Sequence, residues 1–589
     1  MVSCLRLTSL FTNIGFIKKF NMNFLDIQIL VGIKLLLLLF IAVSFYLIFK
    51  RKNPIYFLGL TGIISATSYF LLMNNLQLPF WGLQGDEITI AAMYNAFAHV
   101  GFGADFAYHN LPPFYPPAFF WIFSFIGKLF NLNGIVIFKL AAFSFFLFFP
   151  LALYYFQKYL LREKTLGIFG EKMPGAMFMF LVPLLVITVL DKDLLFGKPY
   201  EIITAVATMF WYISLYIKII SGKLNNKQIL IHGLIAGIIF MVYYLWLIFA
   251  AIALFILGFK DNSKKLFQYF FVLFKTMLVA LVVALPFLVP MIVNYIKNGM
   301  ESWQTSFFTP SGLNLWLPMF QLNGINSLIL LFGLGVLILY RQRIFIKQLG
   351  CLLLVAFIWW GIGMAMLLIF KTPFQEFRGF YVWSPVILTI AAAYGFERIF
   401  LYFKINDNKN VYAVVCVIGV MYFASQSIFG FFVDDPIVRM RRVESRKANQ
   451  AVVDLINYLT QDKLVSSRLT LHTTPQITAF LPINHLLYFN QHNNNPGAIF
   501  SKRYEYVQAL ANSQSGDELY SKIKNCPYGE LERFIFYSDK ESYYLYFHLD
   551  KIIEGIEEKE IKFDKKLFLS NNFRQVYNQN GYVIIDVIR

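Results

Sequence analysis

Two adjacent acids, Asp86 and Glu87, lie in a stretch from Gln84 to Gly127 that contains no Lys or Arg, although the whole chain contains 51 of these residues. They follow the aromatic segment LPFWGLQG. A carboxylate that faces a cavity at a membrane–water boundary can act as a general base. A structural role is the alternative: Asp86 would be the N-cap of a helix over EITIAAMYNAFAHV, with Glu87 in its first turn, beside an interfacial aromatic belt.

A second acidic segment, DKDLLFGKPYE at residues 191–201, repeats this arrangement. It contains Asp191 and Asp193, which a cation and an aromatic residue follow at Lys198 and Tyr200. One such segment alone is typical of a solvated turn. Two acidic segments on the same face of a chain with few charges are less simply explained as solvated turns.

Lys198 and Arg378 are the cations that could bind a phosphate group near the lipid headgroups. Arg378 lies in the segment KTPFQEFRGFYVW. It could equally be a side chain that snorkels to the membrane surface, or the ion-pair partner of Glu376. The sequence leaves these interpretations open.

Composition places these residues in a membrane protein. The chain is 58% hydrophobic and 14% charged, and its mean hydropathy is +0.60. Several apolar runs exceed about 18 residues, which is enough to cross the hydrocarbon core of a bilayer. Unbroken runs exclude a porin-type barrel, whose strands alternate polar and apolar residues. The sequence therefore predicts a polytopic α-helical membrane protein.

Charge divides the chain near residue 433. Residues 1–433 contain 31 Lys and Arg against 14 Asp and Glu, whereas residues 434–589 contain 20 and 19. The net charge of +18 thus belongs to the apolar part, where topology signals explain it more simply than a nucleic-acid surface. We predict an N-terminal tail at 1–23, a membrane domain at 24–433 with a catalytic outer loop at 78–133, and a soluble mixed α/β domain at 434–589.

Apolar runs lie near residues 24–49, 54–77, 134–157, 173–190, 201–220, 229–259, 266–295, 322–340, 348–370, 380–402 and 411–433. The run at 229–259 is too long for one span and short for two, so we interpret MVYYLW at its middle as the turn of a tight hairpin. This gives about twelve spans. The first long run has full spanning length, so we expect no cleavable signal peptide, and Met22 is an alternative start.

Loops rich in Lys and Arg alternate with loops that are poor in them, and the positive-inside rule places the rich ones in the cytoplasm. The basic clusters lie at 50–52, 158–172, 218–227, 260–265, 341–347 and 398–409. This order requires that residues 114–130, apolar but with Pro-Pro near their start, lie in the membrane interface without crossing it. The loops at 84–127, 191–200 and 297–321 and the C-terminal domain are then extracytoplasmic.

The C-terminal region shows alternating helical and strand patterns. An amphipathic helix is expected over DDPIVRMRRVESRKANQAVVDLINYL, and strands over LTLHTT, HLLYFN, RFIFYS and YYLYFHL, followed by a hairpin in FRQVYNQNGYVIIDVI with Asn-Gly at its turn. The loop NQHNNNPG is either an ordinary turn or, through the side chains of Asn490, His492 and Asn493, a site for a polysaccharide acceptor.

A proline-rich motif, NLPPFYPPAFFWI, begins beside His109 and contains Tyr115. His109 is more simply a hydrogen-bonded loop residue than a catalyst. Aromatic rings at Trp81, Tyr108 and Trp121 could stack on sugars, although anchoring at the membrane interface is the simpler role. Cys4, Cys351, Cys416 and Cys526 have no metal-binding spacing, and a disulfide framework is not expected.

An aromatic-flanked GDE after an early span, a long outer loop and a YPP…FFW helix together resemble the GT-C glycosyltransferases, over roughly residues 50–435. More narrowly, NLPPFYPPAFFWI and GKPYE are similar to the galactan arabinofuranosyltransferase family of mycolic-acid-bearing bacteria. The segment NQHNNNPGAIFSKR resembles part of that family's outer domain. The Phe-, Lys- and Asn-rich composition departs from that GC-rich lineage.

The resemblance implies a multi-pass enzyme of the plasma (inner) membrane that moves a sugar, first of all arabinofuranose, from a polyprenyl-phosphate donor to an extracytoplasmic glycan. Asp86 would be the base and Glu87 would orient it, bind the sugar or tune its pKa. The remaining donor-binding residues would be Asp191, Asp193, Lys198, Tyr200, Arg378, His109 and Tyr115. The resemblance assigns no particular cofactor and leaves open a divalent ion at Asp86 and Asp193.

Three alternatives compete with this interpretation. The first is a transferase that moves mannose or aminoarabinose from a polyprenyl phosphate to protein or lipid A. The second is a transporter for lipid-linked saccharides, although transporters tend to show repeated halves, which this sequence lacks. The third is a receptor or scaffold, which would not need converging acids. The absence of cations near Asp86 favours the enzyme, since a neighbouring Lys would lower the pKa of the base and weaken it.

Overall fold

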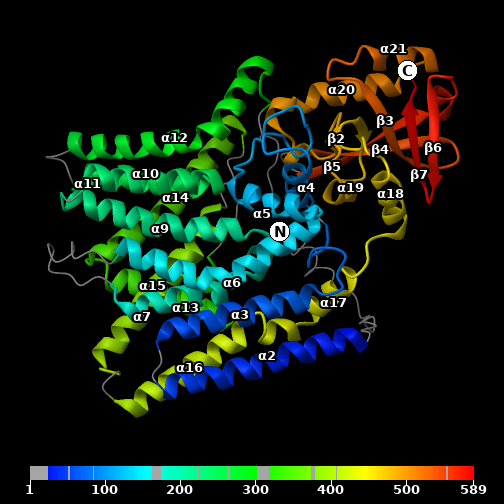
Figure 1. Ribbon diagram of the computed structural model, residues 1–589. Helices are drawn as coiled ribbons and strands as arrows, with labels where there is room; N and C mark the ends of the chain where they lie inside the picture. The colour runs from blue at the N-terminus through cyan, green and yellow to red at the C-terminus, as the bar shows by residue number, and fades with distance from the viewer. Residues whose placement is uncertain are drawn as a thin grey trace.

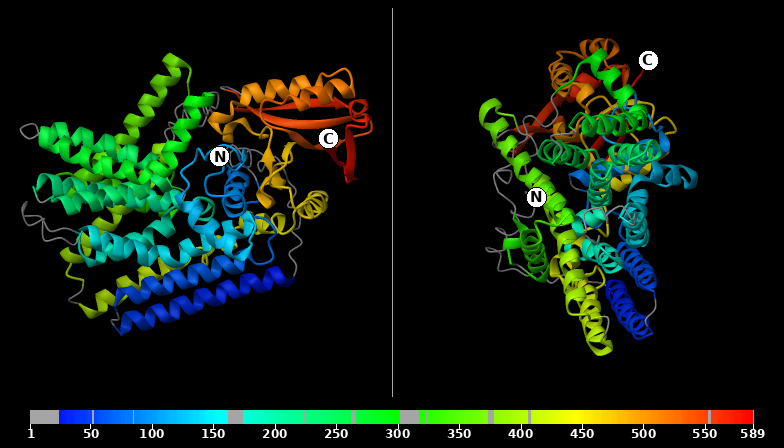
Figure 2. Two further views of the ribbon diagram at one scale, coloured as in Figure 1. Left: turned by 45° about the horizontal axis from the view of Figure 1, so that its top comes forward. Right: turned by 90° about the vertical axis from the view of Figure 1, so that its left-hand side faces the viewer.

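The computed structural model describes residues 24–50, 53–83, 85–161, 174–222, 224–261, 266–301, 317–322, 324–372, 378–405, 408–551 and 555–588. Long helices lie side by side in a bundle, and a domain that contains a β-sheet covers one end of it (Figure 1; Figure 2). The predicted N-terminal tail at 1–23 lies outside the described residues.

Among the described residues, eight helical segments are long and apolar enough to cross a membrane. They are built on α2 (Phe24–Phe49), α3 (Pro54–Met73), α6 (Gly134–Leu161), α9 (Pro199–Ile220), α12 (Leu266–Asn298), α14 (Ile344–Phe370), α15 (Ser384–Tyr402) and α16 (Lys409–Gln426). Four shorter helices complete the set of predicted apolar runs: α7 (Ala176–Val189), α10 (Asn226–Val242), α11 (Leu245–Asp261) and α13 (Ile325–Leu339). The prediction of a polytopic helical membrane protein is confirmed.

The expected hairpin is formed by α10 and α11, which are separated at Tyr243 and Tyr244. Gly233 and Gly237 on α10 allow close packing against α12, because a Cβ at Gly233 would meet the Cβ of Val279 at 2.4 Å. Small residues four positions apart are a common way for membrane helices to approach each other. This contact fixes the hairpin in the bundle and places its turn at the end nearest the sheet domain.

Two helices of the outer loop do not have spanning length. α4 (Asp86–His99) is buried on almost all sides, whereas α5 (Ala118–Phe130) buries Phe119 and Phe120 and exposes Ile122 and Phe125. At 1.5 Å per residue, 13 residues extend about 20 Å, less than a hydrocarbon core of about 30 Å. An amphipathic helix of this length suits the membrane interface.

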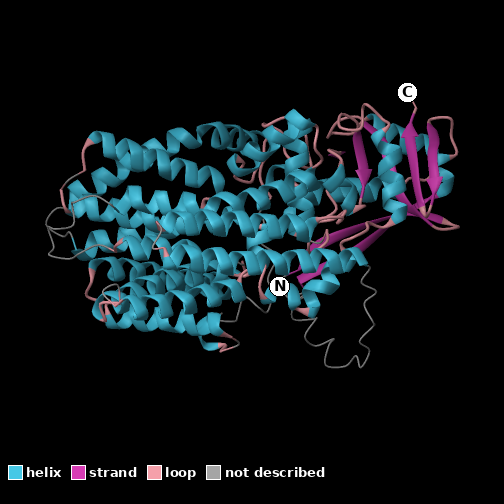
Figure 3. Cartoon of the chain, turned by 60° about the horizontal axis from the view of Figure 1, so that its bottom comes forward, coloured by secondary structure: helices cyan, strands magenta, loops and turns pink. Residues whose placement is uncertain are grey.

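The C-terminal domain combines a seven-stranded mixed sheet with several helices (Figure 3). Its strands are β1 (Leu469–His472), β2 (Asn484–His485), β3 (Leu531–Ser538), β4 (Ser542–Lys551), β5 (Gly555–Asp564), β6 (Phe573–Gln579) and β7 (Tyr582–Val587). Its helices and short turns are η6 (Phe431–Asp434), α17 (Pro436–Glu444), α18 (Gln450–Thr460), α19 (Pro475–Phe480), η7 (Gln491–Asn493), η8 (Pro496–Ala498), α20 (Phe500–Ala511), α21 (Gly516–Lys524) and η9 (Lys565–Phe568). The predicted mixed α/β fold is confirmed.

Three details differ from the sequence prediction. Of the strand expected over HLLYFN, only His485 lies in a strand, the two-residue β2. The single helix expected after residue 433 is divided into α17 and α18, because Asn449 caps the second helix through its side chain. Strand β5 was not predicted. The Asn-Gly turn was, and the positive φ angles of Asn580 and Gly581, 53° and 82°, show the backbone that this dipeptide favours.

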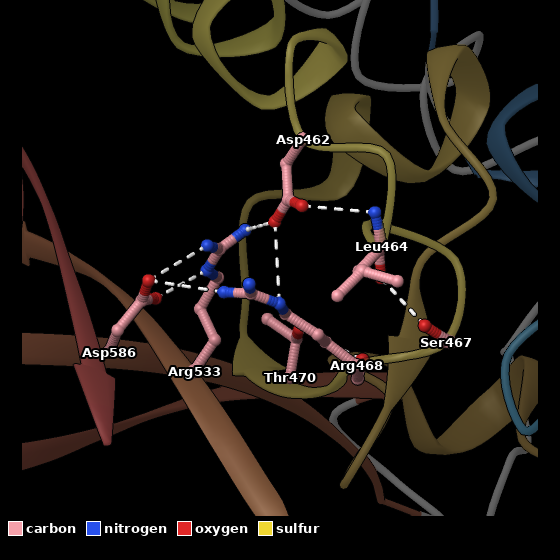
Figure 4. A network of polar contacts seen from close by, with 7 residues as sticks. All are labelled: Asp462, Leu464, Ser467, Arg468, Thr470, Arg533 and Asp586. Carbon is pink, nitrogen blue, oxygen red and sulfur yellow. Dashed lines mark hydrogen bonds and ion pairs between the residues drawn. The ribbon is translucent and has the colours of Figure 1, made fainter. Parts of the chain in front are cut away.

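An ion network fastens the sheet to the loops beside it (Figure 4). Arg533 on β3 bonds Asp586 on β7 at 2.7 Å and Asp462 at 2.8 Å, and Arg468 bonds the same two acids. Burial raises the pKa of Asp462, but the backbone amide of Leu464 and the two arginines outweigh it, so this pKa lies below its usual value.

The membrane and C-terminal domains interlock. The buried Asp26 at the start of α2 pairs with Arg442 and Arg446 around the end of α17. Asn95 on α4 donates to the carbonyl oxygens of Thr478 and Ala479, at 3.2 and 2.7 Å. The sheet domain is thus anchored directly against the loop at 78–133, which fixes its position relative to the acids of that loop.

Candidate active site

Asp86 is the first residue of α4, and the N-cap is Gly85, with a φ of 58°. The alternative that Asp86 itself caps the helix is therefore wrong. Its side chain is 45% exposed and accepts a 2.5 Å hydrogen bond from the ammonium of Lys198. Asp86 is thus paired with a residue that is distant in sequence, and its carboxylate remains partly exposed to solvent.

Lys198 separates the short helix α8 (Lys192–Gly197) from α9, and its side chain is 19% exposed. This ammonium lowers the pKa of Asp86 well below its usual range, with smaller contributions from Arg378 and His492. We expected the cation-free stretch to keep cations away from Asp86. This expectation is wrong, because Lys198, just before α9, comes from another part of the chain and pairs with Asp86.

A second ion pair lies beside the first. The Arg378 guanidinium is 3.3 Å from Oε2 of Glu201, whose side chain is only 1% exposed. Lys198 interacts electrostatically with both acids and with Arg378, so the four groups form one alternating cluster. Glu376, the predicted partner of Arg378, lies outside the described residues.

Aromatic rings line this cluster. The hydroxyl of Tyr115 is 3.3 Å from that of Tyr200, and both rings lie about 6 Å from that of Tyr243 in the α10–α11 turn. Trp246 donates a 3.0 Å hydrogen bond to the backbone oxygen of Glu201. The structure thus brings the YPP motif, the GKPYE motif and the helix break together, as the resemblance implied for the first two.

Glu87 and Asp193 form a second, less ionised acidic group. Burial and the neighbouring Asp86 raise the pKa of Glu87 to about 7. Burial, Asp191 and Glu87 raise that of Asp193 to about 7 as well. Asp191 is exposed and caps α8 by accepting from the amide of Asp193 at 3.0 Å. Near neutral pH the two raised groups are therefore partly protonated.

His109 faces the C-terminal domain. Its Nδ1 lies 2.7 Å from the carbonyl oxygen of Ser466, and its amide donates to Asn484. Burial lowers the pKa of His109 to about 4, so the ring is neutral at physiological pH and gives no cation to a phosphate. Tyr108 is fully buried, and its hydroxyl donates to Asn494, so its ring is not available to stack on a sugar.

The NQHNNNPG loop uses most of its amides inside the protein. Asn490 caps the turn by accepting from the amide of His492, and Asn493 donates to the hydroxyl of Thr89 on α4 at 3.0 Å. Asn495 donates to the buried Asp105 at 3.1 Å. His492 lies 3.4 Å from the buried Asp550 and retains a 19% exposed side chain.

No group of three or more His, Cys, Asp or Glu residues in the described part of the chain is arranged to hold a metal ion. Asp86 is occupied by Lys198, and no contact joins it to Asp193 among these residues. The arrangement does not fit a resident divalent ion, and the chemistry below uses none.

The family described as arabinofuranosyltransferase N terminal matches residues 95–424, more than half of the chain. The chain belongs to this family. Membership makes the protein a membrane-embedded glycosyltransferase, as the sequence predicted. The match includes Tyr115, Lys198, Glu201 and Arg378, while Asp86 precedes it. No curated protein matches the chain in sequence.

Two solved structures resemble this arabinofuranosyltransferase-family chain. ArnT from Cupriavidus metallidurans, bound to undecaprenyl phosphate, is 11% identical, with a TM-score of 0.48 over 89% of this chain and 96% of that one. The Archaeoglobus fulgidus oligosaccharyltransferase, in complex with zinc and sulfate, is 12% identical, with a TM-score of 0.41 over 81% of this chain and 67% of that one.

The candidate site combines a partly exposed carboxylate with two cations and neighbouring aromatic rings. Sequence reasoning found Asp86, Lys198, Tyr200, Arg378 and Tyr115. It did not assign Glu201, Tyr243 or Trp246 to the site. Glu201 is an acid in the first turn of an apolar helix, where charge is costly, and this was the signal that could have identified it.

Proposed function

We propose that the protein transfers a sugar, with arabinofuranose as the first choice, from a polyprenyl-phosphate donor to a glycan such as cell-wall galactan. The observation that carries this proposal is the alternating cluster of Asp86, Lys198, Glu201 and Arg378 at the end of a membrane bundle. It supplies a carboxylate and two cations within one site, as base-assisted transfer from a phosphate requires.

The donor phosphate would bind between Lys198 and Arg378. Both cations are already held near each other by the two carboxylates, so little side-chain entropy is lost on binding. The phosphate would compete with Asp86 for Lys198. This weakens the interaction that lowers the pKa of Asp86, and the carboxylate becomes a better base once the donor is in place.

Transfer is then a single displacement. The acceptor hydroxyl oxygen forms a bond to the anomeric carbon, the bond from that carbon to the phosphate oxygen breaks, and its electron pair leaves with the lipid phosphate. The hydroxyl proton goes to Asp86. Because attack and departure occur on opposite faces, the anomeric configuration inverts. Lys198 and Arg378 stabilise the negative charge that develops on the leaving phosphate.

The acids around this centre would bind the sugar. Glu87 and Asp193, with raised pKa values, can donate as well as accept hydrogen bonds to sugar hydroxyls. Tyr115 and Tyr200 supply the aromatic wall, and Asp191 shapes the loop that carries Lys198. The proposed acceptor residues are Asn490, His492 and Asn493, and His492 lies within electrostatic range of Asp86.

We also propose that the site and the C-terminal domain face outward from the plasma membrane. The site lies at the sheet-domain end of the bundle, where α3, α12 and α14 end and α9 begins. The basic clusters lie in the connections at the other ends of these helices. A membrane-impermeant thiol reagent should label a cysteine placed at Asp86 from outside in intact cells; labelling only from inside would contradict this orientation.

The test of function uses purified full-length protein in lipid nanodiscs with radiolabelled polyprenyl-phosphate sugars and a galactan acceptor. We expect label in the glycan from the arabinofuranose donor and loss of transfer, but not of donor binding, in Asp86→Asn. Transfer from a mannose or aminoarabinose donor instead would replace the proposed sugar. Full activity of Asp86→Asn would remove it as the base.

A further inference from the structure

One face of the C-terminal sheet carries a row of half-exposed tyrosines. Along β4, Tyr543, Leu545 and Phe547 belong to the hydrophobic core that α20 and α21 cover. The alternate residues Tyr544 and Tyr546 lie on the opposite face, because successive side chains of a strand point to opposite sides. This second face is exposed to solvent at β4 and β5.

The strand beside it adds hydrogen-bonding side chains to the same face. In the β4–β5 register, Lys562 is opposite Tyr544, Glu560 is opposite Tyr546, and Glu558 is opposite His548. Glu558 is 63% exposed and 3.3 Å from the His548 ring, and the Lys562 ammonium lies 5.4 Å from the centre of the Tyr544 ring. Each tyrosine thus has a polar side chain directly across the strand pair.

The rings are arranged as a platform. Those of Tyr544 and Tyr546 are nearly parallel, at 9°, with centroids 6.3 Å apart. The ring of Tyr537 on β3 contacts that of Tyr546 edge to face, with centroids 5.5 Å apart and planes at 65°. Asp539 accepts a hydrogen bond from the Tyr544 hydroxyl and holds the outer ring in place.

This platform continues toward the active site. β4 runs from Tyr544 to Asp550 over about 20 Å, at roughly 3.4 Å per residue. Near its end, the amide of His548 donates to Phe489 and the amide of Asp550 donates to Gln491. Asp550 contacts His492, which lies within electrostatic range of Asp86. The two long strands extend from the sheet toward the helix bundle in Figure 3.

We propose that this face, made of Tyr537, Tyr544, Tyr546, His548, Glu558 and Glu560 and called here the tyrosine track, binds a neutral polysaccharide acceptor and leads its end to Asp86. Apolar C–H faces of sugar rings pack on tyrosine rings, and sugar hydroxyls donate charge-assisted hydrogen bonds to carboxylates. The acids of the track disfavour phosphorylated or other anionic ligands. The inference rests on the proposed transfer for its direction and names the surface that holds the acceptor.

The first experiment compares acceptors of different length. In the full-length protein with both Tyr544→Ala and Tyr546→Ala, the KM for a long glycan should rise about tenfold, because each lost ring contact contributes about 0.5–1.5 kcal/mol. The KM for a di- or trisaccharide acceptor and the kcat for both acceptors should remain near wild type. An unchanged KM for the long glycan would overturn the proposal.

Two further variants separate binding from folding. Glu558→Gln with Glu560→Gln keeps the shape of the strands and should also raise the KM for the long glycan. Tyr520→Ala, on α21 against the opposite face of the sheet, is the matched control and should not. If Tyr520→Ala weakens glycan use equally, the tyrosine track is not the binding surface.

The second experiment does not depend on transfer. The long glycan should bind the Asp86→Asn protein in calorimetry, and the tyrosine double variant in that background should bind about tenfold more weakly. If the double variant binds the glycan more weakly but the protein transfers no donor sugar, the proposed function is wrong and the tyrosine track is still a glycan-binding surface. If the glycan binds both proteins equally, or binds neither, the track is refuted.

Discussion

The pair formed by Asp86 and Lys198 allows the proposed mechanism to be tested by a double-mutant cycle. Asp86→Asn removes the base and keeps the side-chain shape, so kcat/KM should fall by about 10²–10⁴. Lys198→Met removes the cation from the leaving phosphate, and a loss of about 10²–10³ is expected from one electrostatic donor. The two groups act on opposite sides of the anomeric carbon, so their effects should largely multiply.

The magnitude of the departure from additivity follows from the structure. The ammonium and the carboxylate are 2.5 Å apart in the resting protein, but Asp86 is 45% exposed, so solvent screens their direct attraction. Because Lys198 is only 19% exposed, the pair couples by about 1–2 kcal/mol, or about five- to thirtyfold in rate. The double variant should therefore lose about 10⁴–10⁷ in kcat/KM, reduced by no more than this factor.

The assay is single-turnover transfer of radiolabelled sugar from the polyprenyl-phosphate donor, with donor binding measured separately. The control is the pair Lys34–Asp434, which lies outside the site and has a similar distance of 2.7 Å. Its acid is as exposed as Asp86, 44% against 45%, and its lysine is more exposed than Lys198, 36% against 19%. Lys34→Met and Asp434→Asn should leave kcat/KM near wild type. A double Asp86–Lys198 variant that is no slower than the worse single variant would refute the two separate roles, because the pair would then act as a unit.

Three other predictions follow from the same geometry. Loss of the Glu87 proton near pH 7 adds negative charge beside the phosphate site, so donor KM should rise between pH 6 and 8. Glu87→Gln should weaken this rise without removing it, because the pKa of Asp193 is also about 7; a KM independent of pH in wild type would contradict this prediction. Arg378→Met leaves the carboxylate of Glu201 buried without this partner and should lower the free energy of unfolding by about 3–5 kcal/mol, seen as a lower Tm. The double variant Arg378→Met with Glu201→Gln should recover the Tm but should not recover sugar transfer. The pKa of Asp462 is lower in the folded than in the unfolded protein, so its ionised carboxylate stabilises the fold above about pH 4 and this stabilisation is lost as pH falls. Asp462→Asn should therefore weaken the dependence of unfolding on acid pH. An unchanged dependence would refute the role of the network with Arg533.

The sequence predicted the helical elements well because the signal for them is local. Unbroken apolar runs give helices in a bilayer, since the backbone must satisfy its hydrogen bonds within each segment. Even the break at Tyr243 and Tyr244 followed from length alone. Strand β5 (GIEEKEIKFD) was missed because Glu557 and Lys559, on the same face as the buried Phe563, break the apolar alternation. The long pairing with β4 makes this segment a strand.

The candidate site was predicted only in part. The residue types of Asp86, Lys198 and Arg378 were sufficient to suggest phosphate chemistry, but their pairing was not. Arg378 was matched with a nearby acid in sequence, whereas its partner among the described residues is Glu201. His109 was predicted to bind the donor, but in the structure its ring contacts the carbonyl oxygen of Ser466 in the C-terminal domain.

By itself the sequence determined the class of protein, the position of the membrane helices and the presence of a separate polar domain. These depend on hydrophobicity and charge summed along short segments, and no distant contact changes them. Only the tertiary structure decided that Lys198 neutralises Asp86, that Glu201 pairs with Arg378, and that Asp550 near the end of β4 contacts His492. Such pairings depend on which helix ends meet, and electrostatic interactions over a few ångströms cannot be inferred from residues more than a hundred positions apart in the chain.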